Sequence, residues 1–157
     1  MIVPQNWNEH KPEMAARDPN NKTRFLIIGA GIAGMTAAAT LREQGFTGEI
    51  MVISREDIGT YDRSLLSKCL IQDQASNWLL KHDHIEVDLK LKCRVWSVNP
   101  KLKKVILTSG EHIQWDKLLI ATGCEAVKPQ IPGVVTIHPQ RPELATNNVY
   151  FLRNSLN

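Results

Sequence analysis

Three glycines spaced as Gly29-x-Gly31-x-x-Gly34 constrain the fold more than any other feature of the sequence. The short apolar run at 25–28 comes directly before them and is typical of a buried parallel strand. The alanine-rich segment 35–44 comes directly after them and favours a helix. The pattern therefore predicts a strand that turns tightly into a helix.

The next stretch of chain completes a βαβ unit. Gly45 is expected to end the helix, and the apolar run at 49–53 predicts a second parallel strand. In such a unit the first glycine permits the turn, the second lets a pyrophosphate approach the backbone, and the third lets helix and sheet pack closely. The free N–H groups at the helix N-terminus attract phosphates. The sequence therefore predicts a bound dinucleotide.

A dinucleotide site of this kind usually has an acidic residue at the end of its second strand, where the acid binds a ribose hydroxyl. Ser54 and Arg55 occupy that position here, and Glu56 and Asp57 follow them. We expect Glu56 to make the ribose contact.

The second half of the chain alternates between short strands and turns. A short strand is predicted at 85–87, followed by an antiparallel meander at 94–98, 103–108 and 111–115. The run at 118–121 is apolar throughout, so we expect it to rejoin the central parallel sheet.

Composition excludes several classes of protein. The net charge is only +3 and aromatic residues make up 6% of the chain, so the sequence favours no nucleic-acid surface. The sequence contains no run of about 18 apolar residues, so it predicts no membrane-spanning helix. The polar segment 1–21 lacks a signal peptide's apolar core, so the sequence predicts no secretory signal there. The sequence predicts no metal ligands, and no catalytic acid or base.

Two further segments are informative beside the glycine motif. Tyr61-Asp-Arg63-Ser-Leu-Leu-Ser67-Lys68 carries two cations, which suit phosphate contact, although by itself it also fits a surface loop. Ala121-Thr-Gly123 ends a predicted strand, and a proline-glycine turn follows at Ile131-Pro-Gly133. A strand that ends in Thr-Gly lets backbone approach a ligand closely.

Together, these three motifs resemble the FAD-dependent pyridine nucleotide oxidoreductases, which have two dinucleotide-binding domains. The resemblance runs from about Lys11 to Arg153. It is strongest to apoptosis-inducing factor-like proteins with an upstream Rieske domain and to oxygenase-coupled ferredoxin reductases. This resemblance implies a cytoplasmic or mitochondrial location. It implies an α/β, Rossmann-like three-layer (β/β/α) FAD/NAD(P)-binding domain, here incomplete.

The resemblance also implies roles for individual residues. Arg63 is expected along the FAD, with Lys68 and Arg153 near the flavin ring and the Val95 backbone against the adenine. Besides Glu56, the residues expected to bind the cofactor are Gly29, Gly31, Ala33, Gly34, Arg63, Lys68, Val95, Thr122, Gly123 and Arg153.

The implied function is that of an NAD(P)H-dependent flavoprotein oxidoreductase. Electrons would pass from NAD(P)H through FAD to an iron–sulfur acceptor, Rieske- or ferredoxin-like, or to another acceptor. We expect an extended lead-in at 1–22, the N-terminal half of an FAD-binding domain at 23–137, and a linker toward a missing NAD(P)H domain at 138–157. The alternative is a non-catalytic, truncated dinucleotide-binding fragment, and we expect the isolated chain to be inactive with NAD(P)H.

Overall fold

The computed structural model describes residues 13–63 and 85–125. Of these, residues 13–60 and 85–122 belong to one compact unit, and residues 61–63 and 123–125 belong to a second. All helices and strands of the described residues lie in the first unit. Lys68, Arg153 and the predicted linker at 138–157 lie outside the described residues.

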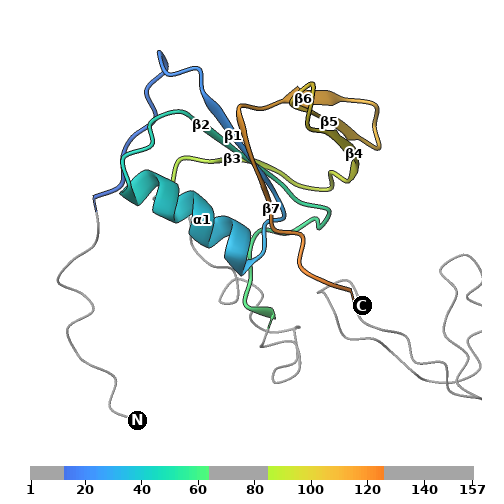
Figure 1. The fold of residues 1–157 in the computed structure, drawn as a ribbon. Coiled ribbons are helices and arrows are strands. Elements are labelled where there is room, and N and C mark those ends of the chain that lie inside the picture. The colour runs from blue at the N-terminus through green and yellow to red at the C-terminus, as the bar shows by residue number, and fades with distance from the viewer. Residues whose placement is uncertain (1–12, 64–84, 126–157) are drawn as a thin grey trace, which may run out of the picture. The chain divides into compact units, whose positions relative to one another are not determined.

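Two sheets and one helix make up the described part of the first unit (Figure 1). One sheet has four strands in the order β3-β2-β1-β7, all parallel, and the other has three antiparallel strands in the order β4-β5-β6. The bounds are β1 Arg24–Ile28, α1 Ile32–Glu43, β2 Glu49–Ile53, β3 Asp88–Lys90, β4 Val95–Asn99, β5 Lys104–Leu107, β6 His112–Gln114 and β7 Lys117–Ile120.

Strand β1 lies at the centre of the parallel sheet, which explains why its sequence is apolar without alternation. It pairs with β2 on one side and β7 on the other, so that Leu26 lies between Met51 and Leu118. Leu26 and Ile27 point to opposite faces and are both fully buried. Both faces of the parallel sheet are therefore covered.

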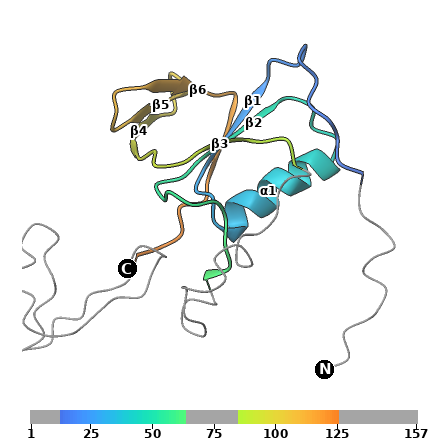
Figure 2. The ribbon, with the colours of Figure 1, turned by 180° about the vertical axis from the view of Figure 1, so that it is seen from behind.

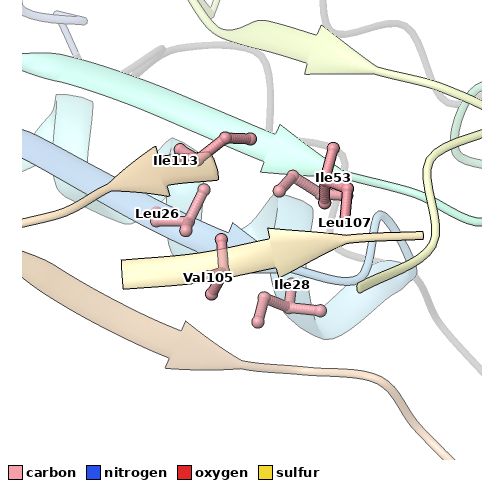
Figure 3. Packing of buried hydrophobic residues seen from close by; sticks show 6 residues of the cluster. All are labelled: Leu26, Ile28, Ile53, Val105, Leu107 and Ile113. Atoms are coloured by element: carbon pink, nitrogen blue, oxygen red, sulfur yellow. The ribbon is translucent and has the colours of Figure 1, made fainter. Parts of the chain in front are cut away.

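The three-stranded sheet covers one of these faces (Figure 3). Side chains from the parallel sheet meet side chains from β5 and β6 in a single apolar cluster. Its buried members are Leu26, Ile28, Ile53, Val105, Leu107 and Ile113.

Helix α1 covers the other face, as the view from behind also shows (Figure 2). Met35 and Ala38 of the helix pack against Ile27, Ile50 and Val52 of the sheet. The spacing of the buried helix residues matches one face of an α-helix. The predicted three-layer β/β/α arrangement is therefore confirmed.

Helix α1 ends at the glycine that the sequence predicts. Gly45 has φ +83°, and its N–H donates to the Arg42 carbonyl at 3.1 Å, while the Phe46 N–H donates to the Leu41 carbonyl at 2.9 Å. This pair of bonds is a Schellman motif. The helix begins at Ile32 rather than at the predicted residue 35, because Gly31 is its N-cap.

The strand predicted at 85–87 is misplaced, since β3 begins at Asp88. Arg42 of α1 donates two hydrogen bonds to the Glu86 carbonyl, at 3.2 and 2.7 Å. Ile85 is buried, but pairing with β2 starts only where Asp88 lies opposite Met51. The strands predicted at 94–98, 103–108, 111–115 and 118–121 are confirmed, with ends that differ by one residue.

Residues 13–23 form neither helix nor strand, but backbone hydrogen bonds connect them to the rest of the first unit. The Ala15 N–H donates to the Arg42 carbonyl at 3.0 Å, and the Asp18 N–H donates to the Thr47 carbonyl at 2.8 Å. Arg17 adds a 3.2 Å ion pair with Asp88. Part of the predicted lead-in therefore contacts the helix and the strands, while the predicted domain boundary after residue 22 stays a prediction.

Candidate dinucleotide site

The turn between β1 and α1 requires glycine at its first position. Gly29 has φ +115°, a conformation that side chains other than glycine rarely adopt. Its N–H donates to the Ile53 carbonyl at 2.8 Å, and a Cβ at Gly29 would overlap the Ala121 carbonyl. The turn is thus held against the ends of both neighbouring strands, β2 and β7.

The other two glycines of the motif differ in their surroundings. A Cβ at Gly34 would overlap the Gly29 carbonyl, so Gly34 lets the helix approach the turn closely. Gly31 is different, because a Cβ there would meet no atom of residues 13–63 or 85–125 within 4 Å. Its backbone is extended, with φ −75° and ψ −178°. Gly31 therefore borders open space at the start of the helix.

The N-terminus of α1 has donors that the helix itself does not use. The first helical hydrogen bond runs from the Met35 N–H to the Gly31 carbonyl at 3.0 Å. The N–H groups of Ile32, Ala33 and Gly34 come earlier and so have no acceptor within the helix. No side chain of the described residues caps this end, and no acidic residue lies in the first turn. The uncompensated N–H groups and the helix dipole favour an anion such as a pyrophosphate.

The segment after β2 holds the predicted ribose-binding acid. Glu56 is buried, and its carbonyl accepts a 2.9 Å hydrogen bond from the Lys92 N–H, while the Cys93 N–H donates to the Ser54 carbonyl at 2.8 Å. Asp57 has a buried Oδ1 without a hydrogen-bond partner among the described residues. Two carboxylates therefore follow β2 at the sheet edge where the glycine turn begins.

The backbone pairing at residues 92 and 93 also brings Val95 toward this edge. Val95 is the first residue of β4, the outer strand of the three-stranded sheet. The pairing with β5 is irregular between Val95 and Ser97, and Trp96 between them is 77% exposed. The start of β4 thus lies two residues beyond a segment that is bonded to the loop carrying Glu56.

The end of β7 lies beside the glycine turn. The Ala121 N–H donates to the Ile28 carbonyl at 2.8 Å, which carries the sheet pairing up to the residue before Gly29. Thr122 follows and is exposed. Gly123, which belongs to the second unit, has φ +69°, so its position favours glycine.

In the second unit, Arg63 and Tyr61 contact each other through their side chains. Arg63 Nη1 donates to the Tyr61 hydroxyl at 3.0 Å, and its guanidinium carbon lies 5.0 Å from the centre of the Tyr61 ring. Stacking on an aromatic ring is a favoured geometry for arginine. Tyr61 thus orients Arg63, whose predicted contact with the cofactor remains a prediction.

Sequence reasoning missed Thr60 and Arg42. The Thr60 hydroxyl donates to the Ala30 carbonyl at 2.6 Å across thirty residues of sequence, and no local pattern signals such a contact. Arg42 is fully buried, and this burial lowers its pKa, although the Glu86 carboxylate opposes the shift. Its position in the buried stripe of α1, four residues after Ala38, is the one signal that could have indicated burial.

The described part of the chain has no group of three or more His, Cys, Asp or Glu residues that could hold a metal ion. It also has no helix long and apolar enough to cross a membrane. What the site offers is a set of backbone donors, the carboxylates of Glu56 and Asp57, and glycines at one edge of the parallel sheet. These features suit the binding and orientation of a nucleotide.

Comparison with known proteins agrees with this geometry. Residues 23–155 match the family described as pyridine nucleotide-disulphide oxidoreductase, whose members use FAD with NAD(P)H. The chain is 37% identical over 107 residues to the 3-phenylpropionate/cinnamic acid dioxygenase ferredoxin–NAD(+) reductase component of Photorhabdus laumondii. It is 36% identical over 117 residues to the biphenyl dioxygenase system ferredoxin–NAD(+) reductase component of Paraburkholderia xenovorans.

Among solved structures, the NADH:rubredoxin oxidoreductase of Clostridium acetobutylicum is similar, with a TM-score of 0.61 and 30% sequence identity. It matches 71% of this chain, and the two reductase components match 65% and 69%. The matched regions span 27%, 28% and 30% of the Photorhabdus, Paraburkholderia and Clostridium proteins. The finer resemblance to apoptosis-inducing factor-like proteins and the cellular location stay predictions.

Proposed function

Because the chain belongs to the pyridine nucleotide-disulphide oxidoreductase family, we propose that it forms the FAD-binding portion of an NAD(P)H-dependent oxidoreductase. The observation that carries this proposal is the open N-terminus of α1 behind the Gly29 turn. Its backbone donors lack intrahelical acceptors, and no atom of the described residues fills the space beside Gly31. The residues present therefore fit a pyrophosphate.

The chain's own residues would bind and orient the cofactor. The N–H groups of the glycine turn and of Ala33 would hold the pyrophosphate, and Glu56 would accept hydrogen bonds from a ribose, with Asp57 as a second acceptor. The Val95 backbone would meet the adenine at the start of β4. Arg63, stacked on Tyr61, would add a cation along the bound molecule. Lys68, Thr122, Gly123 and Arg153 complete the proposed set.

When bound, FAD would supply the chemistry that couples two-electron hydride transfer from a pyridine nucleotide to one-electron transfer to an iron–sulfur centre. The relatives named as ferredoxin–NAD(+) reductase components support this assignment. We accordingly propose a ferredoxin-like or Rieske-type iron–sulfur protein as the acceptor for the whole protein. Neither a nucleic acid nor a membrane is part of the proposal.

FAD retention tests the proposal. The purified chain is mixed with FAD and desalted, and its visible absorption spectrum is recorded. We predict retained flavin bands at about 370 and 450 nm. A colourless protein with an intact circular-dichroism spectrum would contradict the proposal, because the folded glycine turn would then not hold the cofactor.

A charge placed at the helix N-terminus tests where the cofactor binds. Ile32 lies in the first turn of α1 and is 66% exposed, so Ile32→Glu introduces an anion without disturbing the core. We predict at least a tenfold weaker FAD affinity for Ile32→Glu, because the carboxylate repels the pyrophosphate and occupies its donors. In Ile32→Gln the side chain has the shape of glutamate without its charge, so this variant should bind FAD nearly as well as the unchanged chain. Equal affinity of the two variants would place the pyrophosphate elsewhere.

A second candidate function is dinucleotide binding without turnover. It is favoured by the described site itself, whose free backbone N–H groups and glycines serve to bind and orient a nucleotide. NADH oxidation with ferricyanide as acceptor distinguishes the two candidates. FAD retention without NADH oxidation supports the binding function, whereas steady turnover by this chain supports the enzyme.

A further inference from the structure

Thr60 makes a hydrogen bond to the backbone of the glycine turn. Its hydroxyl donates to the Ala30 carbonyl at 2.6 Å. Thr60 is 3% exposed and Ala30 is 8% exposed, so the bond is shielded from water. A buried carbonyl needs a partner, because leaving it unpaired costs about 1–3 kcal/mol. Thr60 supplies that partner from outside the glycine motif.

The bond fixes one peptide unit of the turn. Ala30 lies between two glycines, and the carbonyl of Ala30 shares its peptide plane with the N–H of Gly31. In a trans peptide these two groups point in opposite directions. The Ala30 carbonyl faces Thr60, so the Gly31 N–H faces away from Thr60.

The neighbouring peptide groups are held by other bonds. The Gly29 N–H is fixed by the Ile53 carbonyl, and the Gly31 carbonyl is fixed by the Met35 N–H. The Ala30–Gly31 peptide between them turns by rotation about ψ of Ala30 and φ of Gly31, and glycine restricts the second of these rotations least. Without Thr60, little would prevent this peptide from turning its carbonyl toward the open side of the turn. A carbonyl oxygen there would repel a phosphate.

We propose that Thr60 is a positioning residue for pyrophosphate binding. It holds the Ala30–Gly31 peptide with the carbonyl turned inward, so that the anion meets N–H groups and no carbonyl oxygen. The proposal rests on the proposed FAD-binding function and deepens it, since it assigns a role to a residue outside the motif.

Two substitutions separate the hydroxyl from the shape of the side chain. Thr60→Val removes the donor and keeps the branched shape, whereas Thr60→Ser keeps the donor and removes the methyl group. FAD affinity is measured with the full chain through quenching of flavin fluorescence. We predict about a tenfold weaker affinity for Thr60→Val and an affinity within about twofold of the unchanged chain for Thr60→Ser.

The possible outcomes are distinct. Equal affinities of the unchanged chain and Thr60→Val overturn the role of Thr60 and leave the proposed function standing. Equal losses in Thr60→Val and Thr60→Ser also overturn it, because the hydroxyl would then not be the cause. Failure of the unchanged chain to bind FAD overturns the proposed function itself and the role of Thr60 with it.

One measurement does not depend on the variants folding. A crystal structure of the unchanged chain reports the direction of the Ala30 carbonyl. A carbonyl directed at the Thr60 hydroxyl is the expected result. A carbonyl directed to the open side of the turn, beside Gly31, overturns the proposal even if Thr60→Val cannot be purified.

Discussion

Gly29 is constrained twice at the residue scale. Its φ of +115° is costly for any side chain, and a Cβ would also overlap the Ala121 carbonyl. Gly110 has a similar φ of +86°, but a Cβ there would meet nothing within 4 Å. Substitution of these two glycines thus distinguishes the stability lost to backbone strain from the stability lost to atomic overlap.

We predict that Gly29→Ala lowers the free energy of unfolding by about 2–4 kcal/mol, since strain and overpacking each cost about 1–3 kcal/mol. Gly110→Ala, which adds strain alone, should cost about 1 kcal/mol. Urea unfolding of both variants measures the difference. Equal costs would show that the contact between Gly29 and Ala121 is looser than the structure has it.

The same residue scale shows what sequence can and cannot provide. The glycines of the motif predict a turn because their backbone freedom acts at their own positions. The turn lies where their spacing predicts it. No local sequence pattern identifies Thr60, because its role depends on a carbonyl thirty residues away. Lys68 and Arg153 rest on the family resemblance and remain predictions.

At the scale of elements, Arg42 joins the end of α1 to two other segments. Its guanidinium donates to the carbonyls of Phe46, Gly48 and Glu86, at distances between 2.6 and 3.2 Å. This contact explains why β3 begins later than the sequence predicts. The backbone at Glu86 faces an arginine of α1, and strand pairing starts two residues further on. A strand end set by such a long-range bond cannot be located from local patterns.

We predict that Arg42→Met lowers the free energy of unfolding by about 3–5 kcal/mol, because several buried carbonyls lose their donor at once. Arg42→Lys should recover only part of this loss, since an ammonium group cannot reach three carbonyls with the fixed fork of a guanidinium. Thermal or urea unfolding measures both variants.

Arg17→Met is the matched control for Arg42. The Arg17 side chain is 43% exposed and pairs with Asp88 at the surface, so its loss should cost about 0–1 kcal/mol. Similar losses for Arg17→Met and Arg42→Met would contradict the view that buried carbonyl contacts, rather than surface charge, fix the end of α1.

At the scale of the described first unit, the layers follow from the sequence because each has its own hydrophobic pattern. The continuous apolar run of β1 indicates a strand buried on both faces, and both its neighbouring layers are present. The alternating pattern of β5 indicates a strand with one packed face, and Val105 and Leu107 point into the core. The order of strands was predicted only in part, since pairing partners depend on contacts between distant segments.

Amide chemical shifts on addition of FAD to the full chain test the central claim most directly. We predict that the largest changes fall on the N–H groups of Gly31, Ala33 and Gly34, with smaller changes at Glu56 and Val95. The amide of Gly110, in a turn outside the proposed site, should stay unchanged. Shifts that leave the glycine turn unmoved while FAD binds would contradict the account, because the cofactor would then occupy another part of the chain.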